Sequence, residues 1–221
     1  MPYKLAIFDF DGTLADSVAW AATVLNELAV RYGFRVVAKE ELRMLRGKDN
    51  RAIVRHLGVP FWKMPFIANH GRKLASRDAA RIPLYPGSGA LLRSLAEHGV
   101  ELAIVSSNDE SNIRRILGPE NAGLVRYYEC GASIFGKASK FRRVLKRSGV
   151  KPEDAIAIGD ETRDIEAARG ERLATGAVTW GYATAELLES FRPTWMFAEM
   201  GDIVAACTGV EQQAPLRASG D

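Results

Sequence analysis

The stretch YKLAIFDFDGTLADS, residues 3–17, places two aspartates at the point where an apolar run ends. The run of residues 3–10 is rich in β-forming side chains and is typical of a short buried strand. Inside such a strand, Asp9 and Asp11 would be strongly destabilising unless they were paired or bound to a metal. At the carboxyl end of the strand, the same two carboxylates can point into a crevice. We therefore expect this segment to form a core strand and to place functional side chains at its carboxyl end.

The composition is that of an ordinary globular protein with one large domain or two modest ones. Of the 221 residues, 47% are hydrophobic and 26% are charged. The net charge of +3 is small and the basic residues are dispersed, so we expect no nucleic-acid partner. No apolar stretch approaches the length of a membrane span, and the N-terminus lacks the pattern of a signal peptide, so we expect no membrane partner. The two cysteines, Cys130 and Cys207, lack metal-ligand spacing, which favours a cytoplasmic location.

Further short apolar runs predict a series of strands after the first one. They lie at residues 100–107, 125–133, 154–160 and 174–181, with a possible edge strand at 194–198. Amphipathic helical patterns lie between them, at residues 88–99, 137–149 and 161–170. Alternating strands and helices predict the α/β class, with a Rossmann-like parallel sheet that carries helices on both faces.

Residues 17–82 break this alternation because they contain helical patterns alone. We expect an inserted α-helical cap domain here, with residues 1–16 and 83–210 forming the Rossmann-like core and the polar tail 211–221 disordered. The two connections, at residues 14–17 and 82–87, are expected to form a hinge. Within the insertion, FWKM at residues 61–64 is expected to pack in the small core. The loop at residues 46–50 offers Gly47 as a substrate contact, and a solvent-facing turn is the alternative.

Three polar clusters follow predicted strands. They comprise Asp9, Asp11 and Thr13 after the first strand, Ser106, Ser107 and Asn108 after the second, and Asp160, Glu161 and Asp164 after the fourth. In an open parallel sheet, ligands bind beyond the carboxyl ends of the strands. Carboxylates gathered there need compensating charge, and an oxygen-only ligand set favours Mg²⁺. With a lysine from the segment FGKASK, these groups would meet the requirements of phosphoryl transfer.

In this order, the clusters resemble the motifs of the haloacid dehalogenase superfamily of phosphohydrolases, in its phosphoglycolate phosphatase-like branch. FDFDGTLADS is similar to the first motif, an apolar strand followed by Asp-x-Asp-Gly-Thr, and LAIVSSN and IAIGDETRD are similar to the second and fourth. The resemblance covers about residues 3–208, and the helical insertion corresponds to a cap of that branch. The third motif is a lysine that proline often follows. GKASK lacks that proline; Lys137 has the better spacing, and Lys140, one turn later, is the alternative.

By this resemblance, Asp9 is the nucleophile that accepts the phosphoryl group, and Asp11 is the acid that protonates the leaving oxygen and then activates water. Mg²⁺ would bind Asp9 and Asp160 together with the backbone carbonyl of Asp11. Asp164 would act on the metal through water or orient the catalytic Lys137. For the segment GDETRD alone, a second reading is a loop in which Asp160 caps the following helix, and both roles can coexist.

The resemblance also implies residues that bind the substrate. Ser106 would hold a phosphate oxygen with Ser107 and Asn108 beside it, and Thr13 would support the loop around the phosphate. A serine after a strand is equally common in a simple turn, so Ser106 is the least specific of these motifs.

The function implied is that of a Mg²⁺-dependent phosphatase acting on a small-molecule phosphate ester, either phosphoglycolate-like or a sugar phosphate. A phosphomutase of the same fold, acting on a sugar phosphate, is the alternative, and the sequence distinguishes the two poorly. A dehalogenase is disfavoured because its relatives lack the second aspartate, whereas Asp11 is present. A lid over the strand ends would exclude phosphoproteins. The identity of the ester and the oligomeric state stay open.

Overall fold

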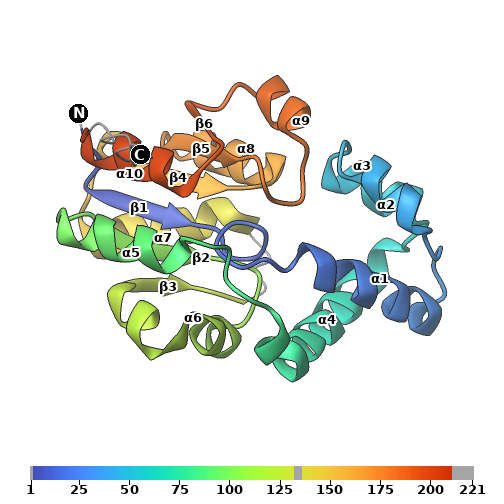
Figure 1. The fold of residues 1–221 in the computed structure, drawn as a ribbon. Helices are drawn as coiled ribbons and strands as arrows, with labels where there is room; N and C mark the ends of the chain where they lie inside the picture. The colour runs from blue at the N-terminus through green and yellow to red at the C-terminus, as the bar shows by residue number, and fades with distance from the viewer. Residues whose placement is uncertain (1, 132–135, 211–221) are drawn as a thin grey trace, which may run out of the picture.

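A single parallel sheet of six strands forms the centre of the chain (Figure 1). The structure, a computed structural model, describes residues 2–131 and 136–210, so the predicted tail 211–221 lies outside the described residues. The strand order is β3-β2-β1-β4-β5-β6, and every neighbouring pair is parallel. The strands are β1 (Leu5–Phe8), β2 (Glu101–Val105), β3 (Tyr127–Glu129), β4 (Ala155–Gly159), β5 (Ala174–Val178) and β6 (Trp195–Phe197).

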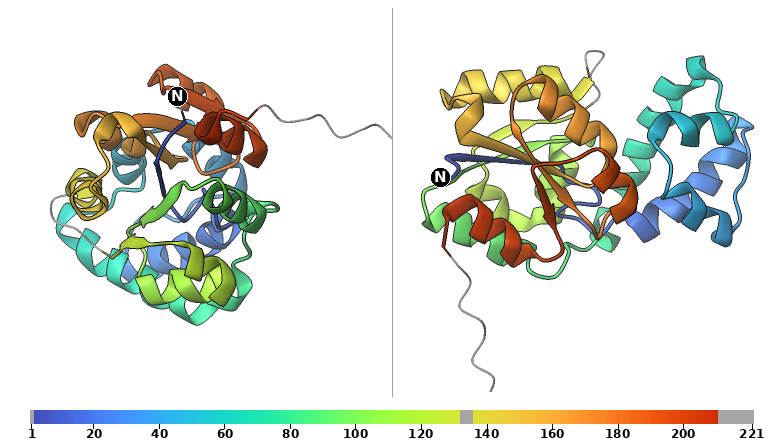
Figure 2. Two further views of the ribbon diagram at one scale, coloured as in Figure 1. Left: turned by 90° about the vertical axis from the view of Figure 1, so that its left-hand side faces the viewer. Right: turned by 90° about the horizontal axis from the view of Figure 1, so that it is seen from above.

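Helices cover both faces of this sheet (Figure 2). They are α5 (Ser88–Glu97), α6 (Glu110–Leu124), α7 (Gly136–Ser148), α8 (Thr162–Gly170), α9 (Ala185–Ser190) and α10 (Met200–Thr208), with the 3₁₀ turn η3 (Pro152–Asp154). Helices α5, α6 and α10 pack in the hydrophobic core on one face, and α7 and α8 pack on the other. This is the predicted α/β class with a parallel sheet. Among residues 2–131 and 136–210, no helix combines the length and apolarity needed to cross a membrane.

The central strand β1 shows why the sheet is buried on both sides. Its alternate residues Ala6 and Phe8 belong to the core shared with α5, whereas Leu5 and Ile7 belong to the core shared with α7. All four side chains have no exposed surface. Because successive residues of a strand face opposite sides, a continuous apolar run is what a doubly covered parallel strand requires.

The helical insertion lies beyond the carboxyl ends of the strands, beside the sheet rather than on it (Figures 1 and 2). Its elements are α1 (Val18–Tyr32), α2 (Lys39–Leu45), α3 (Asn50–His56), η1 (Phe61–Lys63), α4 (Met64–Asp78) and η2 (Ala79–Arg81). Residues of α1, α2 and α4 supply much of its small core. The expectation that the FWKM segment packs there is wrong at two positions, because Phe61 and Trp62 are 89% and 68% exposed. They lie on the single 3₁₀ turn η1, which has too few residues to form a buried face.

The two connections to the insertion run side by side. Ala15 forms an isolated antiparallel bridge with Leu84, and the N–H of Asp16 donates to the carbonyl of Pro83 at 2.9 Å. The N–H of Tyr85 donates to the carbonyl of Leu14, also at 2.9 Å. The insertion is therefore joined to the sheet through one narrow, paired crossing.

Candidate active site

The loop after β1 carries the first two aspartates into the space beyond the sheet. The N–H of Asp9 still pairs with the carbonyl of Ile158 at 2.8 Å, so its backbone continues the strand. The chain then turns at Gly12, whose φ of +80° favours glycine. A Cβ at Gly12 would also collide with the carboxylate of Asp160, so the loop after β1 has no room for a side chain where it passes that carboxylate.

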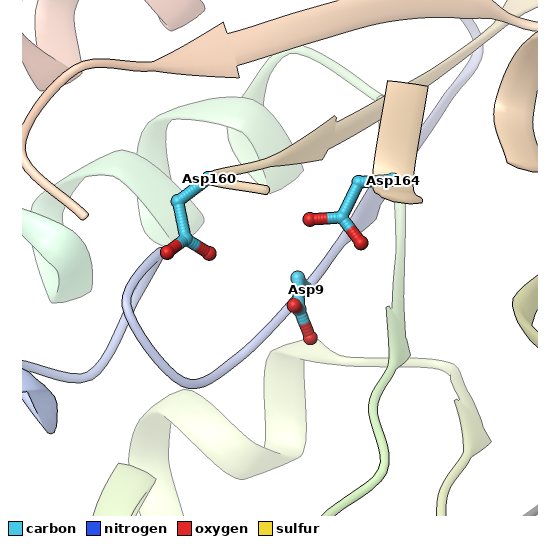
Figure 3. Close-up of side chains that lie close together, drawn as sticks. All are labelled: Asp9, Asp160 and Asp164. Atoms are coloured by element: carbon cyan, nitrogen blue, oxygen red, sulfur yellow. The ribbon is translucent and has the colours of Figure 1, made fainter. Parts of the chain in front are cut away.

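Asp9, Asp160 and Asp164 form a buried acidic cluster (Figure 3). One carboxylate oxygen from each lies within 4.8 Å of the others. The hydroxyl of Thr13 donates to Oδ1 of Asp160 at 2.9 Å, and the N–H of Tyr182 donates to its Oδ2 at 2.7 Å. Thr13, expected in the substrate-binding set, thus contacts an aspartate of the cluster. These bonds hold the Asp160 carboxylate in place through a side chain of one loop and the backbone of another.

Lys137, near the start of α7, supplies a positive charge to the cluster. Its Nζ lies 2.7 Å from Oδ2 of Asp9 and also forms an ion pair with Asp164. Both carboxylates therefore face one ammonium group, which is itself largely buried. Of the two candidate lysines, Lys137 is the one that the structure brings to Asp9.

The electrostatics of the cluster favour a bound cation. Burial raises the pKa of Asp9 to about 6, although Lys137 opposes this rise. Burial, with the nearby carboxylates of Glu161, Asp9 and Asp164, raises the pKa of Asp160 well above its usual range. Burial alone would lower the pKa of Lys137, but the charges of Asp164 and Asp9 outweigh it and leave this pKa raised. Lys137 and Arg163 oppose the charges of four carboxylates, those of Asp9, Asp160, Asp164 and Glu161. A divalent cation with oxygen ligands would compensate the negative charge that remains, so the residues fit such an ion.

Asp11 lies apart from the acidic cluster and lines a cavity of about 310 Å³ between the strand ends and the insertion. Its Oδ2 accepts a hydrogen bond from Nδ2 of Asn108 at 3.1 Å, and burial raises its pKa. Ser107 and Asn108 line the same cavity. The hydroxyl of Ser106, one residue earlier, accepts the N–H of Asn108 at 3.1 Å. The residues after β2 are thus brought to Asp11, and the contact between Asn108 and Asp11 was not foreseen from the sequence.

Comparison with known proteins adds independent evidence. The family model described as haloacid dehalogenase-like hydrolase matches residues 6–178. This chain belongs to the haloacid dehalogenase-like hydrolase family. A protein of Synechococcus elongatus named "Phosphoglycolate phosphatase" is 31% identical over 208 residues, which cover 94% of this chain and 98% of the relative. These matches confirm the predicted family and the predicted class of enzyme, a phosphatase of this family. They also confirm the predicted fold class.

Other relatives of this haloacid dehalogenase-like hydrolase carry different names. One of them, from Mycobacterium tuberculosis, is named "Tyrosine-protein kinase PtkA" and is 28% identical over 197 residues, covering 86% of this chain and 67% of the relative. Among solved structures, "a predicted phosphatase from Clostridium acetobutylicum" superposes with a TM-score of 0.80 at 21% identity, covering 95% of this chain and all of that one. That structural likeness shows the fold alone.

In this haloacid dehalogenase-like hydrolase, Asp160 does not cap α8. Glu161 is the N-cap residue, and it forms a capping box with Asp164: the Glu161 side chain accepts the N–H of Asp164, and the Asp164 carboxylate accepts the N–H of Glu161. The reading of Asp160 as N-cap is therefore wrong, because its carboxylate is occupied by Thr13 and Tyr182. The Asp164 carboxylate takes part in the capping box of α8 and also pairs with Lys137. The start of α8 therefore fixes the position of this carboxylate in the acidic cluster.

Lys140 has a structural position that the sequence did not reveal. Lys140, the alternative motif lysine, is only 3% exposed. Its Nζ donates to the carbonyls of Ser106 and Gly131, one in the loop after β2 and the other after β3. Lys140 thus ties the loop that contains Ser106 to α7.

We expect Lys140→Met to lower the free energy of unfolding by about 2 kcal/mol, because two buried carbonyls lose their charged donor. Urea unfolding followed by circular dichroism measures this difference. Lys146→Met is the matched control, since Lys146 lies on the same helix and is exposed. Equal stability losses in the two variants would contradict the role assigned to Lys140.

The insertion contacts the strand ends through the loop predicted to touch the substrate. In this loop, the N–H of Gly47 donates to the carbonyl of Met44 at 3.2 Å, as in a helix end. Its neighbour Arg46 reaches across and donates to the carbonyls of Gly181 and Tyr182, at 2.8 and 3.1 Å. Asn50 donates to Glu161 at 2.5 Å. The sequence singled out this loop but not the contacts of Arg46 and Asn50 with the core, because side chains that bridge two parts of a fold leave no local pattern in the sequence.

Proposed function

We propose that this chain is a Mg²⁺-dependent phosphatase that hydrolyses a small phosphate monoester through an aspartyl-phosphate on Asp9. The observation that carries the proposal is the position of Asp9, buried at the end of β1 with Asp160, Asp164 and Lys137 around its carboxylate. Asp11, two residues later, borders the adjoining cavity. In this proposal, the nucleophile, the proton donor, the cation site and the cationic clamp would lie together at one edge of the sheet.

The metal would be held by Asp9 and Asp160, and Asp164 would contact it through a water molecule. Asp164 also forms an ion pair with Lys137. The family resemblance adds the backbone carbonyl of Asp11. When bound, Mg²⁺ offsets carboxylate charge and polarises phosphoryl oxygens. The buried carboxylates with few compensating charges support this assignment, and oxygen ligands favour Mg²⁺ over softer metals.

In the proposed reaction, the Asp9 carboxylate attacks phosphorus while the bond from phosphorus to the leaving oxygen breaks. Asp11 gives its proton to that leaving oxygen, so the alcohol departs neutral. Asp11 then takes a proton from a water molecule, whose oxygen attacks phosphorus and releases inorganic phosphate from Asp9. The hydrogen bond from Asn108 orients the Asp11 carboxylate for both transfers. Lys137 screens the negative charges of Asp9 and of the incoming phosphate.

The residues after β2 would bind the phosphate. Ser107 and Asn108 line the cavity, and the buried hydroxyl of Ser106 lies next to them. We assign Ser106 to a phosphate oxygen, as the family resemblance implies. Thr13 supports the site by holding Asp160.

The helical insertion would act as a cap domain, residues 17–82, on a core of residues 1–16 and 83–210. The paired crossing at Ala15 and Leu84 would be the hinge. Arg46 would dock the cap, because it binds the backbone of the loop whose Tyr182 N–H holds Asp160. A cap that closes over the strand ends limits access to small molecules, which supports a small-molecule ester as substrate.

Metal removal tests the proposal. With Mg²⁺, we expect phosphate release from at least one ester of a panel containing p-nitrophenyl phosphate, phosphoglycolate, hexose phosphates and nucleotides. EDTA should lower the rate by about 100-fold or more, and added Mg²⁺ should restore it. Release that is insensitive to EDTA would reject the metal assignment. Interconversion of sugar phosphates without release would favour the phosphomutase.

A further inference from the structure

The cavity of about 310 Å³ at Asp11 has two unlike walls. The wall formed by the strand ends is polar and includes Asp11, Ser107 and Asn108. The wall formed by the insertion, from helices α1 and α4, is mostly apolar, with Arg72 of α4 as its charged residue. Its residues include Trp20, Val24, Leu25, Leu28, Ala68 and Ala75. The phosphate-binding side and the side that must receive the rest of the substrate therefore differ sharply in chemistry.

Trp20 is held in a fixed orientation on the apolar wall. Its indole Nε1 donates to Oδ2 of Asp78 at 3.1 Å, and the Arg77 guanidinium donates to both oxygens of that carboxylate at 2.9 and 2.8 Å. The hydrogen bonds from Arg77 and Trp20 lower the pKa of Asp78 to about 2, so this carboxylate stays charged at neutral pH. Because its one polar atom is occupied by Asp78, Trp20 offers the cavity an apolar ring.

The cationic residues that line this cavity within the described chain already have acidic partners. Nε of Arg72 lies 3.5 Å from Oδ1 of Asp109, and Nη2 of Arg163 lies 2.9 Å from Oε1 of Glu161. A carboxylate on the substrate would have to compete with these ion pairs. It would also approach Asp11 and Glu161, which line the same cavity.

A second cavity, of about 300 Å³, borders the first, and most of its lining is apolar apart from Arg43, Arg46 and Tyr182. The two share Ala21, Leu25 and Tyr182, and the second extends between α1 and α2 towards Leu42 and Ile53. Apolar surface thus continues from the Asp11 cavity into the insertion. Sugar hydroxyls that faced Leu25, Leu42 and Ile53 would lose their hydration without gaining hydrogen-bond partners, which is unfavourable.

We propose that the substrate is a phosphate monoester with a compact, uncharged apolar or aromatic leaving group that packs against Trp20 and Leu25. This inference rests on the proposed phosphatase function and names the substrate class of the same site. It favours an aryl or alkyl phosphate over phosphoglycolate or a sugar phosphate, because the wall opposite Asp11 offers mainly apolar contact area and its cation, Arg72, is paired with Asp109.

Binding of phosphonates, which the reaction cannot cleave, tests the inference without requiring turnover. In isothermal titration calorimetry with Mg²⁺ present, we expect benzylphosphonate to bind at least tenfold more tightly than phosphonoacetate. Equal affinities, or tighter binding of phosphonoacetate, would overturn the inference and show that Arg72 or Arg163 accepts a carboxylate.

Two variants with matched controls locate the effect on the apolar wall. Ala68→Arg adds a cation at an exposed position of the wall and should reverse the preference towards phosphonoacetate, whereas Val30→Arg, at a 76% exposed position outside the cavity, should not. Trp20→Ala should weaken benzylphosphonate binding about tenfold, and Trp62→Ala, 68% exposed outside the cavity, should leave it unchanged. An unchanged preference in the folded Ala68→Arg variant would count against the inference.

Hydrolysis separates this inference from the proposed function. Phenyl phosphate should give a higher kcat/KM for phosphate release than phosphoglycolate. If neither ester releases phosphate while benzylphosphonate still binds more tightly, the phosphatase proposal fails and the binding preference stands. If phosphoglycolate is the better substrate and phosphonoacetate the tighter ligand, the phosphatase stands and the inference is overturned.

Discussion

Replacing Asp9 with asparagine is expected to lower phosphate release by about 10⁴-fold or more while leaving the fold intact. An amide cannot attack phosphorus as a carboxylate does, and loss of a nucleophile removes the covalent route altogether. The fold should persist because asparagine has the same shape and removes one of three clustered negative charges. Steady-state phosphate assays measure the loss, and thermal unfolding followed by circular dichroism checks the fold.

Asp154→Asn is the matched control for this variant. Asp154 pairs with Lys4 at the amino ends of β4 and β1, at the opposite edge of the sheet from the acidic cluster. Its substitution should leave turnover within about twofold of the unmodified protein. Turnover near the normal rate in Asp9→Asn would remove Asp9 as the nucleophile and leave the proposed aspartyl-phosphate without a site.

Replacing Asp11 with asparagine should separate the two halves of the reaction. Asp9 is still able to accept a phosphoryl group slowly, but no carboxylate remains to take a proton from water, so kcat should fall by about 10²- to 10⁴-fold. A phosphoryl donor with a good leaving group, such as the mixed anhydride acetyl phosphate, needs little protonation in the first half. With it, we expect phosphorylated protein to accumulate, and mass spectrometry after acid quenching should detect the added phosphoryl group on Asp9.

The double variant Asp9→Asn/Asp11→Asn controls for phosphorylation elsewhere and should carry no added phosphoryl group. Unchanged steady-state turnover in Asp11→Asn would refute the proton-transfer role. A slow variant that never accumulates the phosphorylated form would instead show that Asp11 acts in the first half alone.

The sequence predicted the sheet well because burial on both faces demands a continuous apolar run, which is a local property. Each of the six predicted runs contains a strand, including the short edge strand β6. Helix α6 was not predicted, since Gly118 and Pro119 lie inside it and favour a break. The structure joins two helical pieces across a kink at Gly118, where φ is +74°. The two residues that would break a regular helix are thus accommodated by a bend in α6, and residues on both sides of the bend pack in the core.

The sequence by itself determined that carboxylates gather at one edge of the sheet, since Asp9, Asp11 and Asp160 follow apolar strands whose carboxyl ends must share that edge. Only the tertiary structure decided which lysine joins them. Lys137 and Lys140 lie one turn apart on α7, about 4.5 Å along its axis. The docking of α7 on the sheet brings Lys137 to Asp9 and Lys140 to two backbone carbonyls.

The apolar wall opposite Asp11 likewise depends on tertiary structure. The pattern of α1 predicts an amphipathic helix, and some of its apolar residues do pack in the core of the insertion. Val24, Leu25 and Leu28 also line the cavity that faces Asp11. The helical periodicity of a sequence indicates that a side chain lies on an apolar face. Whether that face packs against protein or lines a substrate cavity depends on the distance between the insertion and the strand ends.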